Sequence, residues 1–165
     1  MKRLGLAIAV LALGLAAGCG DDNGNPGGPS NVTIFTVNLL PSNEVPPITN
    51  AEQSARGTAV ITINRAANTV DFAVSLNSFP TTSTLTAAHI HGPAGAGVNA
   101  GVLVNTGLAA SNAPSLGSGS GTFSFPGIVP TNADIIPAIL ANPQNYYFNV
   151  HTSVNPGGVI RGQLQ

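Results

Sequence analysis

The three histidines of this chain are the residues best suited to chemistry, and all of them fall within two short motifs. His89 and His91 lie in the segment HIHGPAG, and His151 lies in NVHTSVNPGGVIRGQL. Residues at i and i+2 on a β-strand point to the same face, so His89 and His91 can share one metal ion. His151 is the one histidine left to complete a three-nitrogen set, which would suit copper or zinc.

The same histidines also have a structural interpretation, which the sequence favours over a metal site. Gly- and Pro-rich loops follow the two motifs, at 92–99 and 153–158, and many backbone carbonyls there need hydrogen-bond donors. Imidazole N–H groups can supply those donors. The chain has no CxxC- or HExxH-like spacing that would sharpen the metal hypothesis, so both interpretations stay open.

Glu44 and Arg161 are charged residues in a chain of which only 7% is charged. We expect a buried ion pair between them that pins the loop around Glu44 to the last strand. There are two functional alternatives for Glu44. It could be a further metal ligand, or it could hydrogen-bond a ligating histidine and orient it.

The residue patterns of other catalytic sites are missing from the sequence. No GxSxG motif occurs, which argues against a serine nucleophile. Paired-carboxylate hydrolysis is also disfavoured, because the acids of the domain are scattered over Glu44, Glu52, Asp71 and Asp134. We therefore expect no catalytic residues. An enzymatic role would need the histidine metal site together with an open coordination position.

The N-terminal 31 residues indicate export rather than a folded domain. Lys2 and Arg3 precede an apolar stretch, 4–17, that is shorter than the roughly 20 residues of a membrane-spanning helix. The stretch runs into LAAGC and so resembles a bacterial lipoprotein signal. That resemblance implies cleavage of residues 1–18 and acylation of Cys19. Residues 19–31 are rich in Gly, Asn, Asp and Pro and are predicted to form a flexible tether.

The expected location and partners of the protein follow from this N-terminus. A lipid on Cys19 would anchor the protein in the bacterial cell envelope. Glycine rather than aspartate follows the cysteine, at position 20, and this resembles the enterobacterial lipoproteins that are sorted to the outer membrane. Removal of the signal leaves three arginines against six acidic residues, a net charge of −3, and no lysine. Such a chain offers no basic patch for nucleic acid. Acylation would also leave no free thiol, which excludes a disulfide framework. Besides the membrane lipid, the expected partner is a protein or a polymer.

Residues 32–165 are predicted to form one all-β domain. Apolar and polar residues alternate in the segments 56–64 and 69–76, as they do in half-buried strands. Short strands between Gly- and Pro-containing loops favour an antiparallel, immunoglobulin-like sandwich or a barrel. One short helix is expected near 134–141, where apolar residues have helical spacing. The remaining strands are expected at 32–40, 85–91, 101–105, 119–125, 146–152 and 159–164.

A faint internal echo relates the two histidine motifs. Each would be a strand that ends in histidine, followed by a Gly/Pro loop and a returning strand. The first runs from 90–91 to 101–104, and the second from 150–151 to 158–161. Two such hairpins could place the histidines near each other.

Three motifs taken together resemble the CHRD (chordin) domain: EVPP at 44–47, HIHGP at 89–93, and YFNVHTSVNPGGVIRGQ at 147–163. The resemblance covers about residues 33–165 and implies an all-β, immunoglobulin-like or barrel-like fold. It brings no catalytic residues. In animals the domain occurs within chordin, an extracellular antagonist of growth factors, and in bacteria it occurs in exported proteins.

The sequence as a whole favours a lipid-anchored, non-enzymatic β domain of the cell envelope that acts as a binding or interaction module. The alternative is an envelope protein that binds copper or zinc through the three histidines.

Overall fold

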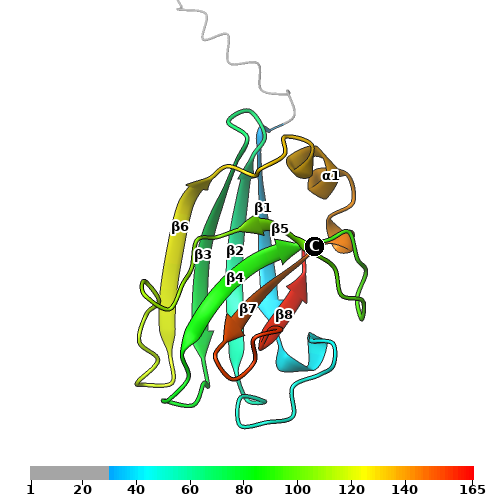
Figure 1. Cartoon of the computed structure of the whole chain (residues 1–165). Coiled ribbons are helices and arrows are strands. Elements are labelled where there is room, and N and C mark those ends of the chain that lie inside the picture. The colour runs from blue at the N-terminus through cyan, green and yellow to red at the C-terminus, as the bar shows by residue number, and fades with distance from the viewer. Residues whose placement is uncertain (1–29) are drawn as a thin grey trace, which may run out of the picture.

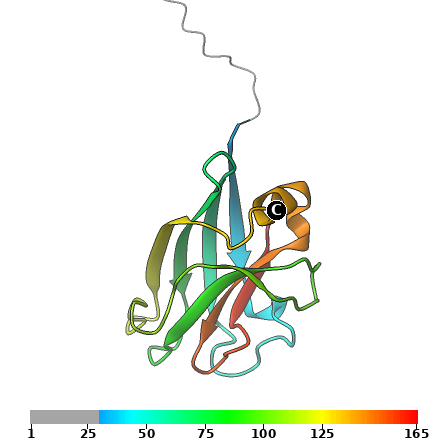
Figure 2. The same ribbon diagram turned by 45° about the horizontal axis from the view of Figure 1, so that its top comes forward.

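The computed structural model describes residues 30–165, which form two antiparallel sheets of four strands each. The first sheet has the order β1 (Val32–Leu39), β2 (Arg56–Asn64), β3 (Thr69–Asn77) and β6 (Gly121–Ile128). The second has the order β5 (Val102–Asn105), β4 (Leu85–His91), β7 (Tyr147–Thr152) and β8 (Ile160–Gln163). The second sheet lies over the first (Figures 1 and 2), which confirms the predicted all-β sandwich. In the part of the chain that is described, the strands do not close into a barrel.

The first sheet follows directly from the alternation in its sequence. Along β2 and β3, every second residue is buried. The two strands pair in a register that sets Ile61 opposite Phe72, so the apolar residues of both strands share the inner face. This sheet contributes much of the core, and its outer face is polar or exposed at most positions.

Strand β7 in the second sheet is covered on both faces, which a simple alternating pattern does not predict. All six residues of β7 are buried. Phe148 and Val150 point into the core, where the ring of Phe148 stacks on Phe72 of the opposite sheet at a centroid distance of 5.5 Å. The alternate residues of β7 face the other way and include His151.

Strand β6 extends three residues beyond the predicted end at residue 125. The residue that follows the predicted end is Pro126, and proline cannot donate to a sheet ladder. β6 lies at the edge of its sheet, where a missing donor is tolerated. A register shift opposite Val70 and Phe72 accommodates the extra residues, and the carboxylate of Asp71 accepts a hydrogen bond from the N–H of Gly127 at 2.6 Å.

The edges of the two sheets meet along β1 and β8. Leu40, directly after β1, forms a backbone bridge with Arg161. Gly162 is required at this seam, because a Cβ there would lie 2.3 Å from the carbonyl oxygen of Asn38. A short 3-10 turn, η1 (Pro41–Asn43), then leads into the loop that carries Glu44.

The predicted short helix is present as α1 (Ile135–Ala141). Pro137 lies in its first turn, where a missing N–H costs no hydrogen bond. A second 3-10 turn, η2 (Pro143–Asn145), joins the helix to β7. In Figure 1 this helix packs at one end of the sandwich, beside the C-terminus.

The predictions for the N-terminus fall on residues that the structure does not describe. They are the signal segment 1–18, the acylation site Cys19 and all but the last two residues of the tether 19–31. Within residues 30–165, no helix has the length and apolar character needed to cross a membrane.

Candidate metal centre

The two histidine motifs lie on neighbouring strands in the middle of the second sheet. β4 and β7 pair antiparallel, with His89 opposite Asn149 and His91 opposite Tyr147. Directly opposed residues of a pair project from the same face, so His151, two residues beyond Asn149, lies diagonal to His89 on that face. The hairpins β4–β5 and β7–β8 are those that the internal echo suggested, and the pairing of β4 with β7 brings all three histidines together.

The histidine face is turned away from the core and is covered by two loops. We call these the β4–β5 loop (residues 92–101) and the β7–β8 loop (residues 153–159). His91 and His151 are each only 7% exposed, whereas His89 is half-buried. The histidines therefore occupy a partly closed site, and His89 is its most accessible member.

The ligand nitrogens of the histidines are close enough to approach one metal ion. One nitrogen from each residue lies within 4.8 Å of the other two. His89 Nδ1 and His151 Nε2 are 3.1 Å apart. A tetrahedral zinc ion with bonds of about 2.0–2.1 Å would hold its nitrogens about 3.3 Å apart. The His89–His151 pair is already at ligand spacing, and the other pairs would have to close by at most about 1.5 Å.

Backbone carbonyls of the two loops determine the tautomers of two histidines. His91 Nδ1 lies 3.0 Å from the carbonyl oxygen of Ala100, and His151 Nδ1 lies 2.9 Å from that of Pro156. A carbonyl can only accept, so each Nδ1 carries the proton and donates it. Each Nε2 is left with a lone pair, which is how metal-ligating histidines are commonly held. The structural and the metal interpretations are therefore compatible, since they use different nitrogens.

His91 Nε2 is the clearest sign of an unmet interaction in the site. The atom is buried and has no hydrogen-bond partner. Buried polar atoms are almost always paired, and an unpaired one costs about 1–3 kcal/mol. A ligand that accepts this lone pair would remove that cost.

Burial keeps the three imidazoles in their neutral form. It lowers the pKa of His89 to about 4, and the neighbouring His151 and His91 add to the effect. Burial also lowers the pKa of His91 and His151, although their hydrogen bonds to backbone carbonyls oppose it. Neutral imidazole is the metal-binding form, so the site can bind a cation at neutral pH without first releasing protons.

The guanidinium of Arg161, on β8, stacks on the ring of Tyr147 beside the three histidines. Its side chain is 1% exposed, and Cζ lies 3.3 Å from the centre of the Tyr147 ring. The Tyr147 ring stacks in turn on His91, with a centroid distance of 4.8 Å and an interplanar angle of 2°. Guanidinium, phenol and imidazole thus form one continuous stack that fixes the plane of His91.

The guanidinium also holds the β4–β5 loop. Arg161 donates to the carbonyl oxygen of Val98 at 2.7 Å and to Oδ1 of Asn99 at 3.1 Å. The next residue in this loop is Ala100, whose carbonyl accepts from His91. Arg161 therefore positions His91 both through the ring stack and through the loop.

Glu44 does not contact Arg161 in the way the sequence analysis expected. Within residues 30–165, no hydrogen bond joins the two side chains, because the guanidinium is occupied by the β4–β5 loop and the Tyr147 ring. Glu44 Oε1 is buried without a partner. Burial raises the pKa of Glu44 to about 7, and the charge of Arg161 lowers it only in part. The two residues therefore interact only through the long-range electrostatic effect of the Arg161 charge on the Glu44 carboxyl.

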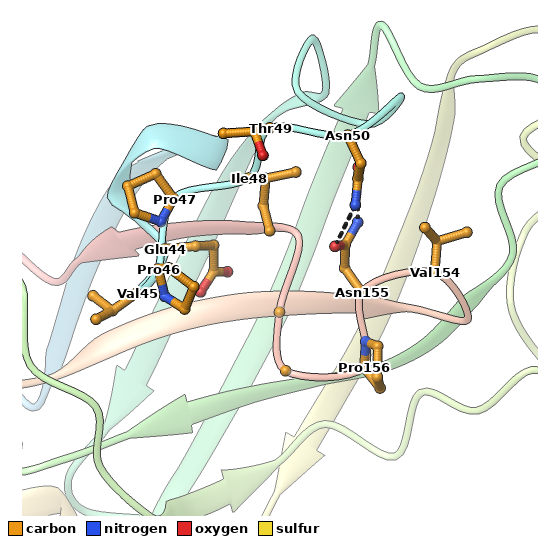
Figure 3. A pocket seen from close by; sticks show the side chains of 12 residues that line it. Glu44, Val45, Pro46, Pro47, Ile48, Thr49, Asn50, Val154, Asn155 and Pro156 are labelled. Atoms are coloured by element: carbon orange, nitrogen blue, oxygen red, sulfur yellow. Dashed lines mark hydrogen bonds between the residues drawn. The ribbon is translucent and has the colours of Figure 1, made fainter.

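Glu44 also stands apart from the potential ligand group, which consists of the three histidines. It lines a pocket of about 290 Å³ between the segment 44–50 and the β7–β8 loop. Figure 3 shows the side chains of Asn50 and Asn155 meeting across this pocket, where Asn50 Nδ2 donates to Asn155 Oδ1 at 2.8 Å.

Glu52 is a positioning residue that the sequence analysis missed. Its carboxylate is 1% exposed and accepts hydrogen bonds from Ser83 Oγ at 2.5 Å, Thr152 Oγ1 at 2.7 Å and Asn155 Nδ2 at 2.5 Å. Two of these donors belong to the end of β7 and the loop after it, which carries the Pro156 carbonyl that orients its histidine. No spacing in the sequence indicates this cluster, because its donors come from segments far apart in the chain.

Comparison with known proteins places this arrangement in a family. The family model of the CHRD domain matches residues 35–164, from within β1 to just beyond β8. No curated protein and no solved structure matches the chain. The matched segment contains the three histidines and both buried charges that position their loops. Because the family model covers nearly the whole sandwich, the chain belongs to the CHRD domain family.

Proposed function

We propose that this protein is a metal-binding β-sandwich module that holds copper or zinc through His89, His91 and His151. The observation that carries the proposal is the arrangement of lone pairs. Loop carbonyls take the Nδ1 protons of His91 and His151, and His91 Nε2 is left buried and unpaired beside the other two imidazoles. A borderline-soft divalent cation is the ligand that suits such a cluster of neutral imidazoles.

The cellular setting belongs to the same proposal. The lipoprotein-like signal supports a lipid on Cys19, and through it an anchor in the cell envelope, with the outer membrane as the favoured location. A domain held there would meet metal ions outside the cytoplasm. Membership of the CHRD family supports a binding role and supplies no catalytic residue, so we propose metal binding rather than turnover.

The test is metal titration of the purified protein without a histidine tag. We expect one equivalent of Cu(II) or Zn(II) in the wild type, measured by calorimetry and by elemental analysis after dialysis. His91→Ala and His151→Ala should each remove stoichiometric binding while near-ultraviolet circular dichroism shows a folded protein. Thr58→Ala, on the outer face of the opposite sheet, is the matched control and should bind like the wild type. A wild type that binds neither metal more tightly than about 1 mM, or about −4.1 kcal/mol, would overturn the proposal.

A further inference from the structure

The carboxamide of Asn149 lies inside the histidine cluster. Asn149 stands directly opposite His89 on the neighbouring strand, and its side chain is 1% exposed. Asn149 Oδ1 is 2.9 Å from His151 Nε2, which is itself 3.1 Å from His89 Nδ1. An oxygen therefore approaches the same nitrogen that the metal site needs.

No hydrogen-bonding proton lies between Asn149 Oδ1 and His151 Nε2. His151 donates its Nδ1 proton to Pro156, so its Nε2 bears a lone pair. Asn149 Oδ1 is also an acceptor, and two acceptors 2.9 Å apart repel each other. His89 can donate a proton to His151 Nε2, but that proton does not lie between Nε2 and the amide oxygen. A cation that accepts both lone pairs would turn this repulsion into coordination.

The Asn149 amide is oriented with its oxygen towards the histidines and its nitrogen towards Glu44. Its Nδ2 and the carboxyl oxygen Oε1 of Glu44 lie 2.6 and 2.5 Å from the point that a Cβ on Gly158 would occupy. The amide N–H group is thus on the side of the acidic residue, and the carbonyl is on the side of the imidazoles. A reversed amide would set its oxygen on the side of the Glu44 carboxyl. Because Gly158 has no side chain, the side chains of Glu44 and Asn149 can both lie against its Cα.

We propose that the side-chain oxygen of Asn149 is a fourth metal ligand, beside one nitrogen from each of His89, His91 and His151. This inference rests on the metal site proposed above and completes it as a set of three nitrogens and one oxygen. The set is neutral and contains no sulfur, which suits Cu(II) or Zn(II) and disfavours Cu(I). Asn149 therefore contributes to the choice of metal as well as to affinity.

The test uses Cu(II) as the probe, because its electron paramagnetic resonance spectrum reports the donor atoms. The proteins are the wild type, Asn149→Ala and Asn149→Asp. Asn149→Asp replaces a neutral ligand oxygen with a charged one of nearly the same shape, and we expect Cu(II) to bind at least about tenfold more tightly at pH 7. Asn149→Ala removes the oxygen and should weaken binding by about tenfold or more. Both variants should shift the spectrum while retaining hyperfine coupling to the three histidine nitrogens.

Asn105→Ala is the matched control. Asn105 flanks His89 from the other side, on β5, but it is exposed and bonds within its own turn. Its replacement should change neither affinity nor spectrum. If Asn149→Asp fails to tighten binding and neither Asn149 variant shifts the spectrum, Asn149 is no ligand, and the three-histidine site stands without it. A wild type that binds neither Cu(II) nor Zn(II) would instead end the proposed function itself. A gain of affinity in Asn149→Asp cannot come from misfolding, so a poorly folded alanine variant leaves the test intact.

Discussion

The two loops that cover the histidines are held by buried charges of opposite sign. The β4–β5 loop is fastened by the cation of Arg161, and the β7–β8 loop by the anion of Glu52. The groups around each charge complement it. Arg161 donates to carbonyl and amide oxygens and stacks on an aromatic ring, whereas Glu52 accepts from hydroxyl and amide groups. Each loop then presents one carbonyl to one histidine.

In both loops a charge is buried without an opposite charge in contact, because neutral dipoles surround it. The desolvation of an ion costs several kcal/mol, and only several well-placed hydrogen bonds offset it. Removing one of these ions therefore does more than cut a single contact, because it leaves the loop dipoles without a partner. The two loops should respond independently, since they share no anchor.

The largest effect is expected from Arg161→Ala. The change removes the guanidinium that stacks on Tyr147 and the hydrogen bonds that hold the β4–β5 loop. We therefore expect the free energy of unfolding to fall by about 4 kcal/mol. Urea denaturation followed by circular dichroism measures this. Imidazole ¹⁵N shifts should show that His91 loses its fixed tautomer while His151 retains it. Arg65→Ala, at an exposed turn, should stay within about 0.5 kcal/mol of the wild type. A similarly small loss in Arg161→Ala would show that the stack does not stabilise the loop.

A somewhat smaller effect is expected from Glu52→Gln. The variant preserves the shape, but its amide turns a donor towards groups that are themselves donors, so we expect a loss of about 3 kcal/mol. The ¹⁵N experiment should now give the reverse pattern, with His151 disturbed and His91 unchanged. The control is Asp134→Asn, because Asp134 is exposed and makes no side-chain cap to α1. Equal disturbance of both histidines would contradict the independence of the two loops.

The local part of this architecture could be predicted from the sequence. Alternation in β2 and β3 and the Gly/Pro punctuation locate all eight strands to within a few residues, because these signals lie within each segment. The i, i+2 spacing of His89 and His91 places both on one face, and the echo of the two hairpins indicates the approach of His151.

The loop anchors could not be predicted, because they depend on contacts between distant segments. Glu52 meets Ser83 and Asn155, which are 31 and 103 residues further along the chain. Charge alone pairs Arg161 with Glu44 in the sequence. The stacked Tyr147 ring and the loop carbonyls that occupy the guanidinium leave no signal in the sequence.

Glu44 belongs to neither anchor, and its replacement by glutamine should give the smallest effect, one that depends on pH. Burial raises its pKa from 4.5 to about 7, so between these values the folded protein binds a proton that the unfolded chain releases. Its contribution to stability is therefore present below about pH 4.5 and is lost as the pH rises to about 7. The full shift would correspond to about 3 kcal/mol, and we expect about 2 kcal/mol to be observed.

Glu44→Gln cannot ionise, so its stability relative to the wild type should rise between pH 4.5 and pH 8 by that amount. Urea denaturation of both proteins at the two pH values measures the difference. The comparison between proteins matters, because the lowered pKa values of the histidines make the stability of both rise over part of the same range. A difference that does not change with pH would mean that folding leaves the pKa of Glu44 unshifted. The charge of Arg161 would then fully offset the effect of burial on this carboxyl.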